Sequence, residues 1–107
     1  MIPYSTQSIS NQDISAVTKI LKSRLITQGK VVQIFEKMLA KKVGAKYAVA
    51  ANSATSALHM ACLALGLSKK DYLWTSSNSF VASANCGRFC GANIDFVDID
   101  KDTWNIS

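Results

Sequence analysis

Apolar residues alternate with polar ones at helical spacing near the start of the chain. An extended arm, residues 2–8, comes first, and Ser10 then stands where it can cap a helix, with Asp13 placed to complete a capping box. The apolar positions that follow fall on one face of that helix: Ile14, Val17 and Leu21. The pattern predicts a first helix that ends near Ser23.

The same spacing returns after a short break. Residues 24–29 have no helical period and close on a glycine, which predicts a loop. A second helix is predicted from Lys30 to Val43, and Gly44 suits its end because glycine adopts the left-handed conformation that closes many helices. The apolar face of this helix consists of Val31, Phe35, Met38 or Leu39, and Val43.

Beyond Gly44, short apolar runs alternate with segments of helix length. Strands are predicted at residues 47–51, 72–75 and 94–97, and helices at residues 54–65 and 80–89. Strand, helix, strand, helix, strand is the order of a parallel sheet built from right-handed crossovers. The predicted fold class is therefore α/β, with a parallel βαβαβ unit in residues 46–107 and an arm and two helices in residues 1–45.

Composition and charge exclude some classes of protein. Hydrophobic residues make up 49% of the chain, enough for a folded core, and no apolar run approaches the roughly 20 residues that span a bilayer. The first residues lack the features of a secretory signal, so we expect a cytoplasmic protein without a membrane partner. The net charge of +5 favours anionic partners without choosing among nucleotides, phosphates, nucleic acid and acidic domains, and most basic residues are expected on solvated helix faces.

Cysteine, histidine and aspartate side chains are further candidates for chemistry. Cys86 and Cys90 stand one helical turn apart, but a zinc site needs two more ligands, and only His59 is available. An odd number of cysteines without an export signal favours free, packed thiols. We interpret His59 as a surface or core residue of its helix and Asp98 and Asp100 as a solvated turn, and we predict no metal.

The segment Asn52–Leu58 lies where the first predicted strand passes into a helix. Unpaired backbone N–H groups and the positive end of the helix dipole meet there, and small hydroxylated residues let a phosphate approach. A cap formed by Ser53 or Asn52 explains the same composition, so the residues alone do not decide between an anion site and a simple cap. The glycine-rich fingerprints of nucleoside triphosphate and dinucleotide sites are absent from the sequence.

A second polar segment, residues 75–85, follows the next predicted strand. Since parallel strands end at one edge of a sheet, this segment is expected beside the first, at the edge where α/β proteins bind ligands. Phe80, predicted at the start of its helix, can present its ring to a flat ligand or pack in the core as an ordinary aromatic residue. The residues leave both possibilities open, and the core is the commoner outcome.

Five short segments in a fixed order make the sequence recognisable: Thr27-Gln28-Gly29, Phe35-Glu36, residues 52–59, residues 80–85 and residues 96–100. Together they resemble the DegT/DnrJ/EryC1/StrS family of sugar aminotransferases, which use pyridoxal 5'-phosphate (PLP), and the resemblance spans the chain. It implies the aspartate aminotransferase-like fold type I, of which this chain would be the N-terminal part of the large, PLP-binding domain. The implied reaction moves an amino group from glutamate to the C4 keto group of a UDP-linked 4-keto-6-deoxy sugar, in pseudaminic acid and surface glycan biosynthesis. A homodimer without a nucleic acid partner is implied as well.

The resemblance assigns two sets of contacts. Ala54 and Thr55 would hold the PLP phosphate through their amides and the Thr55 hydroxyl, with Ser53 and Ser56 flanking them. Phe80 would stack on the pyridine ring. Contacts to the sugar nucleotide fall on Tyr4 and on the loop residues Arg24, Leu25, Ile26 and Thr27.

The resemblance assigns no catalytic residue to this chain. Transamination needs a lysine that forms a Schiff base with PLP and a carboxylate paired with the pyridinium nitrogen, and in the family both lie beyond residue 107. We therefore expect an N-terminal fragment, inactive alone and either marginally stable or self-associating. Two alternatives stay open: a PLP-dependent sugar dehydratase of the same fold, in which histidine replaces the lysine, and a non-catalytic anion-binding or interaction module.

Overall fold

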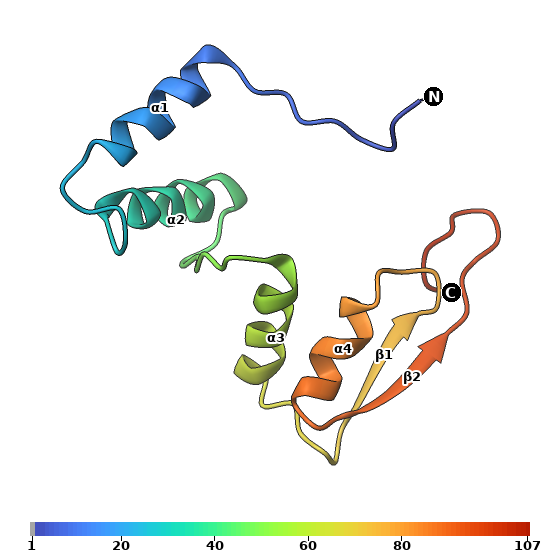
Figure 1. The fold of residues 1–107 in the computed structure, drawn as a ribbon. Helices are drawn as coiled ribbons and strands as arrows, with labels where there is room; N and C mark the ends of the chain where they lie inside the picture. Colours follow the sequence, from blue (N-terminus) through green and yellow to red (C-terminus); the bar gives the residue numbers. More distant parts are fainter. Residues whose placement is uncertain (1) are drawn as a thin grey trace. The chain divides into compact units, whose positions relative to one another are not determined.

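The computed structural model describes residues 2–107. Over this range the chain forms the four helices and two strands labelled in Figure 1: α1 (Asn11–Leu21), α2 (Lys30–Val43), α3 (Ala54–Ala64), β1 (Tyr72–Ser76), α4 (Ala82–Phe89) and β2 (Asn93–Val97). Contacts divide the chain into one unit that ends at Val49 and a second from Ala50 to Ser107. The first unit contains α1 and α2, and the second contains the sheet with its two helices.

The helix α1 begins as its sequence predicts. The Ser10 hydroxyl accepts a hydrogen bond from the Asp13 N–H (3.3 Å), and the Asp13 carboxylate accepts one from the Ser10 N–H (2.8 Å). The second bond is the main cause that lowers the pKa of Asp13 below its ordinary value. The capping box is therefore complete, while the apolar face of α1 buries no side chain within the described residues.

The predicted bounds of α2 are also confirmed. The helix runs over Lys30–Val43, and Gly44 follows in the left-handed conformation with φ 69°. This turn lets the Ala45 N–H donate to the carbonyl of Ala40 at 2.9 Å, which satisfies one of the carbonyls left open at the helix end.

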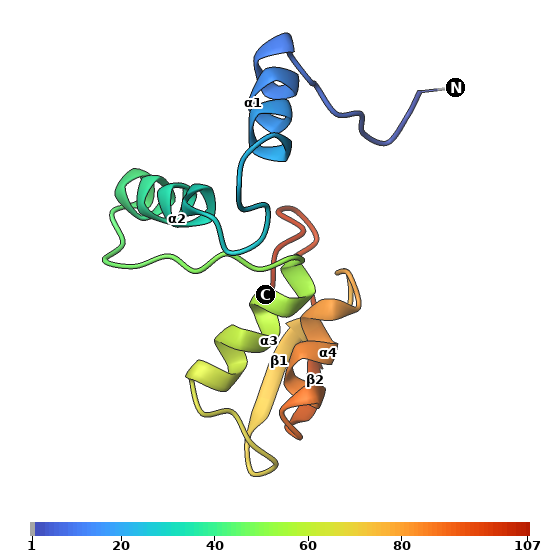
Figure 2. The same cartoon turned by 60° about the vertical axis from the view of Figure 1, so that its left-hand side comes forward.

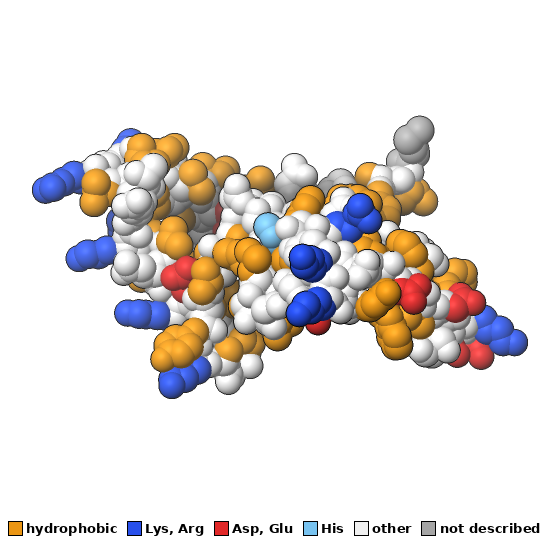
Figure 3. All heavy atoms as spheres, turned by 90° about the horizontal axis from the view of Figure 1, so that it is seen from below, with side chains coloured by type: hydrophobic (Ala, Val, Ile, Leu, Met, Phe, Trp, Pro, Cys, Tyr) orange, Lys and Arg blue, Asp and Glu red, His pale blue; other side chains and the backbone are white. Residues whose placement is uncertain are grey.

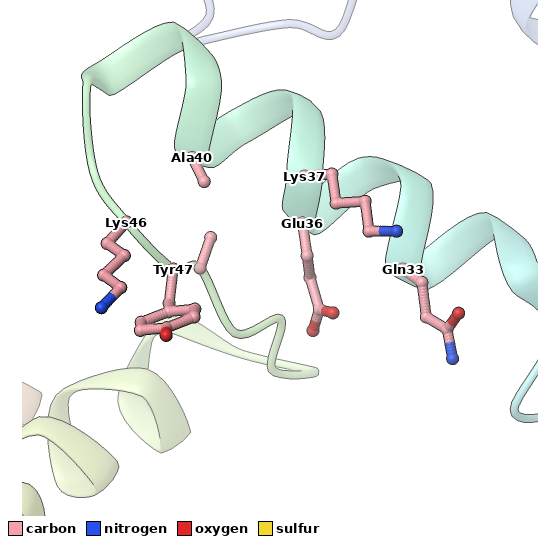
Figure 4. A pocket seen from close by; sticks show the side chains of 7 residues that line it. Gln33, Glu36, Lys37, Ala40, Lys46 and Tyr47 are labelled. Atoms are coloured by element: carbon pink, nitrogen blue, oxygen red, sulfur yellow. The ribbon is translucent and has the colours of Figure 1, made fainter.

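After this turn the chain comes back alongside α2. Figure 4 shows Lys46 and Tyr47 opposite the face of α2 that carries Ala40 and Glu36, and these residues line a cavity of about 240 Å³. The Lys46 Nζ lies 5.3 Å from the centroid of the Tyr47 ring, within the range of a cation–π interaction. Within the first unit, the segment after Gly44 thus lies beside α2.

In the second unit, β1 and β2 form a parallel pair, in which Leu73 stands opposite Ile94. The helix α4 connects the strands and packs on this pair, since a Cβ at Gly87 would lie 2.8 Å from Ile94 Cδ1 and 3.0 Å from Leu73 Cδ1. The helix α3 packs on α4, where the rings of His59 and Phe89 meet edge to face at 5.3 Å. The predicted parallel strands with a connecting helix are confirmed, and His59 lies in a helix interface.

Both helices of the second unit begin at the same end of the sheet. In Figure 1 the arrows of β1 and β2 point toward the end at which α3 and α4 start, and Figure 2 shows the same arrangement from another side. The two polar segments that precede α3 and α4 therefore share this end. The predicted strand-edge arrangement holds for these segments, although only one of them follows a strand.

The predicted strand at residues 47–51 is wrong. The sheet found in residues 2–107 consists of β1 and β2, and residues 47–51 are not paired with either strand. An apolar run shows that a segment suits a buried environment, but a strand also needs a neighbouring backbone with which to form a ladder. Periodicity contains no information about that neighbour.

The predicted start of the helix at Phe80 is wrong as well, because α4 begins at Ala82. Its cap residue, Val81, has no side-chain acceptor, and the Ser79 hydroxyl is hydrogen-bonded to the Ser83 hydroxyl at 2.9 Å. The Ser83 N–H instead donates to the carbonyl of Phe80 in a tight turn (2.9 Å). Phe80 thus stands in the loop, ahead of the helix.

Small side chains make up the buried apolar positions of the described residues: Ala40, Cys62, Ala82, Cys86 and Ala92. Most of the larger apolar side chains are exposed. Figure 3 shows hydrophobic side chains over much of the face that it draws. Within residues 2–107 no helix combines the length and the apolar character that crossing a membrane requires.

Candidate functional site

The start of α3 is both a cap and an open set of donors. The Ser53 hydroxyl accepts a hydrogen bond from the Ser56 N–H at 3.1 Å, and the Ser56 hydroxyl donates to the Asn52 side chain at 3.1 Å. Ser53 is therefore the helix cap, as one of the two interpretations of the sequence requires. This cap satisfies the third backbone N–H of the helix, that of Ser56, and does not involve the first two.

Those first two amides belong to Ala54 and Thr55. In the part of the chain that the structure describes, neither amide has an acceptor, and the Thr55 hydroxyl has no partner either. The first turn of α3 carries no acidic residue, so the positive end of the helix is not compensated. The cap and an anion site are therefore compatible here, and the donors present fit a phosphate group.

A cavity of about 210 Å³ lies where the strands end. Residues from the end of β1, the following loop, the start of α4 and β2 line it: Thr75, Ser76, Ser77, Ser79, Phe80, Val81, Ser83, Ala84 and Phe96. The Asn78 N–H donates to the Ser76 hydroxyl at 3.1 Å, which shapes the loop. This strand-end cavity is rich in hydroxyl groups and has aromatic walls.

Phe80 is 74% exposed, so its ring does not pack in the core of the second unit. It lines the strand-end cavity from the loop that precedes α4. The sequence favoured a core position because most phenylalanines are buried. The exposed ring instead stands at the end of the sheet from which the amides of α3 also start, as Figures 1 and 2 show for the two helices.

The loop between α1 and α2 borders a cavity of its own, which we call the interhelix cavity. It measures about 390 Å³ and is lined by Ile20, Ser23, Arg24, Leu25, Ile26, Gly29, Lys30, Val31 and Val32. Three of the residues expected to contact a sugar nucleotide are therefore brought together. Thr27 and Tyr4 do not line this cavity, and Tyr4 is fully exposed on the arm before α1.

Lys30 is the residue of the interhelix cavity that sequence reasoning missed. As the first residue of α2, it was counted with the solvated basic face of that helix. The available signal was its position, because a lysine directly after a glycine and at the start of a helix places positive charge at the positive end of the dipole.

The thiols form a separate cluster between α3 and α4. Cys62 and Cys86 are buried, Cys90 is partly buried, and all three are free. Burial, together with contacts to the thiols of Cys86 and Cys90, raises the pKa of Cys62 to about 11. A protonated, buried thiol is a packing group rather than a nucleophile. No group of His, Cys, Asp or Glu side chains within residues 2–107 is arranged to hold a metal ion.

The sequence profile of the DegT/DnrJ/EryC1/StrS aminotransferase family matches residues 7–107. The chain belongs to this family. Membership confirms the resemblance drawn from the five short segments. The first of these segments lies in the loop before α2, and the third includes the start of α3.

Relatives of this DegT/DnrJ/EryC1/StrS chain include enzymes that act on nucleotide sugars. The UDP-4-amino-4,6-dideoxy-N-acetyl-beta-L-altrosamine transaminase of Campylobacter jejuni (strain 81-176) is 47% identical over 102 residues, which are 95% of this chain and 27% of that protein. The chain thus spans about a quarter of the length of this relative.

Solved structures agree with the α/β fold. A Streptococcus pneumoniae protein described as a sugar aminotransferase, in its PLP form, matches with a TM-score of 0.92 and 29% identity, over 99% of this chain and 27% of that one. The E. coli GDP-4-keto-6-deoxy-D-mannose-3-dehydratase with bound hydrated PLP matches with a TM-score of 0.88 and 29% identity, over 98% and 28%. The predicted fold, that of PLP-dependent aminotransferases of this family, is confirmed.

Proposed function

We propose that these residues belong to a longer PLP-dependent aminotransferase that transfers an amino group from glutamate to the C4 keto group of a UDP-linked 4-keto-6-deoxy sugar. The observation that carries this proposal is the 47% identity to a transaminase named for a UDP-4-amino-4,6-dideoxy sugar, over 95% of the chain. The product would serve the biosynthesis of pseudaminic acid or another surface glycan. A homodimer and a cytoplasmic location belong to the same proposal.

The second unit supplies the cofactor contacts in this proposal. The amides of Ala54 and Thr55 and the Thr55 hydroxyl bind the phosphate of PLP, with Ser53 fixing the helix start beside it. The exposed ring of Phe80 stacks on the flat face of the cofactor. When bound, PLP supplies the electron sink that amino transfer requires, and the Schiff-base lysine comes from outside these residues.

The first unit supplies the substrate contacts. Arg24, Leu25 and Ile26 line the interhelix cavity, where an apolar wall and a guanidinium group suit a nucleotide with a charged diphosphate. Tyr4 and Thr27 complete the proposed set of sugar-nucleotide contacts. The support for these two residues is the resemblance of the sequence to the family, because neither lines the cavity.

Replacement of Thr55 tests the cofactor site in the full-length protein. Thr55→Val removes the hydroxyl and keeps the shape, and we expect the Kd for PLP to rise at least about tenfold, the value of one hydrogen bond to a charged group. Binding is measured by titration of the cofactor's yellow absorbance, and borohydride reduction should fix the cofactor on a lysine. Thr18→Val, on an exposed position of α1, is the matched control. Equal PLP affinity in both variants would contradict the assignment.

A sugar dehydratase is the second candidate, favoured by the match to the E. coli dehydratase with a TM-score of 0.88. The two reactions leave different products, a 4-amino sugar in one case and a 3-deoxy keto sugar in the other. Mass spectrometry of the product, with isotopically labelled glutamate nitrogen, separates them. Nitrogen label in the sugar supports the aminotransferase, and a sugar without label that has lost water supports the dehydratase.

A further inference from the structure

The interhelix cavity has two cationic residues on its wall, of which the proposed substrate contacts include one. Arg24 comes from the loop after α1, and Lys30 is the first residue of α2. Neither side chain has an ion-pair or hydrogen-bond partner within residues 2–107. The remaining wall is mostly apolar, so Arg24 and Lys30 are the charged residues among those that line the cavity.

The start of α2 makes this charge arrangement unfavourable without an external anion. Its cap residue, Gly29, provides no side-chain acceptor, and the first turn of α2 contains no acidic residue. By contrast, α1 has an aspartate in its first turn, and α3 has a serine cap. A lysine at the first position adds positive charge to the positive end of the helix, where an anion is the stabilising partner.

A tight turn of the loop places Arg24 and Lys30 on the wall of the same cavity. Gln28 adopts a positive φ of 55°, and a Cβ at Gly29 would lie 3.0 Å from the Leu25 carbonyl oxygen. A side chain at position 29 would therefore press on the backbone that follows Arg24. The close turn brings the beginning of α2 against the loop that carries Arg24, with the cavity between them.

We propose that Lys30, together with Arg24, binds the diphosphate of the nucleotide-linked substrate and thereby raises the affinity for this substrate. The inference rests on the proposed function, because it assigns a diphosphate to the cavity that the substrate loop borders. The two cations match the charge of a diphosphate, and the apolar wall suits the uncharged parts of a nucleotide. Lys30 is thus a specificity residue for nucleoside diphosphates over monophosphates.

The test uses the full-length enzyme and three probes: UDP, UMP and uridine. In Lys30→Gln, calorimetry should show a Kd for UDP raised by about tenfold or more, a smaller rise for UMP and no change for uridine. The affinity for UDP should also depend less on salt, because one exposed charge has been removed. In Lys30→Gln, KM for the sugar substrate should rise with kcat nearly unchanged. Lys30→Arg keeps the positive charge and should retain most of the UDP affinity.

Lys37→Gln is the matched control, since Lys37 lies on the same helix but lines the cavity beside Tyr47 instead. The inference is overturned if Lys30→Gln binds UDP as tightly as wild type does. It is also overturned if Lys37→Gln loses as much UDP affinity, which would indicate an effect of general charge. An equal loss of affinity for uridine would overturn it too, because it would indicate damage to the fold. Failure of the proposed function has a different signature: a wild-type enzyme that does not aminate the sugar. UDP binding that depends on Lys30 in such an enzyme would still support the inference.

Discussion

Cys62 shows at the scale of one residue how burial changes chemistry. Its thiol lies between α3 and α4, and burial, followed by contacts with the thiols of Cys86 and Cys90, raises its pKa from 9.0 to about 11. The folded protein therefore keeps a proton that the unfolded chain loses between these values. The stability that this thiol contributes is complete below pH 9 and falls as the pH rises toward 11.

We expect Cys62→Ala to remove this part of the alkaline dependence. The variant should be less stable than wild type at neutral pH, because it leaves a small cavity, but the difference should shrink between pH 8.5 and pH 10.5. Urea unfolding of the full-length protein at several pH values measures this difference, and comparison with wild type cancels the titration of lysines and tyrosines. A constant difference across the range would show that the thiol does not change its pKa on folding.

Residue types alone left the start of α3 undecided, and the structure shows why. Ser53 and Thr55 are small polar residues that suit both a cap and a phosphate site. Which amides the cap leaves open depends on backbone geometry: Ser53 caps the Ser56 N–H, and the amides of Ala54 and Thr55 have no acceptor within residues 2–107. Phe80 could not be placed for a related reason, because exposure of an aromatic ring depends on packing between elements rather than on its neighbours in sequence.

At the scale of elements, the predictions succeeded where local chemistry marks a boundary. The capping box fixed the start of α1, and Gly44 fixed the end of α2. The start of α4 has no capping side chain, and there the prediction was two residues early. The failed strand at residues 47–51 depended on a partner strand, which no local signal reveals.

The capping box gives a local prediction for α1. Ser10→Ala removes the hydroxyl that caps the Asp13 N–H, and we expect amide hydrogen exchange in α1 to become about fivefold faster, the typical effect of losing an N-cap. The hydrogen bond from the Ser10 N–H is the main cause that lowers the pKa of Asp13. The stability that the Asp13 carboxylate contributes is therefore present above pH 4 and is lost at lower pH. Ser5→Ala, in the arm, should leave the exchange rates unchanged. Equal rates in both variants would show that the box does not hold the helix.

The contact between α4 and the sheet gives a second prediction at this scale. Gly87→Ala places a Cβ 2.8 Å from Ile94 Cδ1, and overpacking of this kind costs about 1–3 kcal/mol, partly offset by the better helix propensity of alanine. Ile94→Val removes the Cδ1 atom, so the double variant should be more stable than the sum of the two single effects. Denaturant unfolding of the four proteins measures the coupling. Additive effects would mean that the helix moves away from the sheet instead.

For the whole molecule, the distribution of charge is uneven. Residues 1–49 carry eight basic and two acidic side chains, whereas residues 50–107 carry four and five. The overall net charge of +5 therefore originates in the unit that holds the interhelix cavity. Charge alone predicts an anionic partner without a location, and the interhelix cavity, with Arg24 and Lys30 on its wall, is the location that we propose.

The surface of the whole molecule predicts how residues 1–107 behave when produced alone. A two-stranded sheet is marginal by itself, and each of its strands has an unpaired edge within the described residues. Trp74 on β1 is 69% exposed, and the buried apolar residues are all small. We expect this segment to self-associate and to bind a hydrophobic dye, and sedimentation velocity should show a broad, concentration-dependent distribution.

Two tryptophan variants test whether the open strand causes this association. Trp74→Lys should reduce association because a lysine on an open strand opposes pairing, whereas Trp104→Lys, in a loop with similar exposure, should not. A monodisperse monomer that unfolds cooperatively would mean that α3, α4 and the two strands form a self-sufficient core.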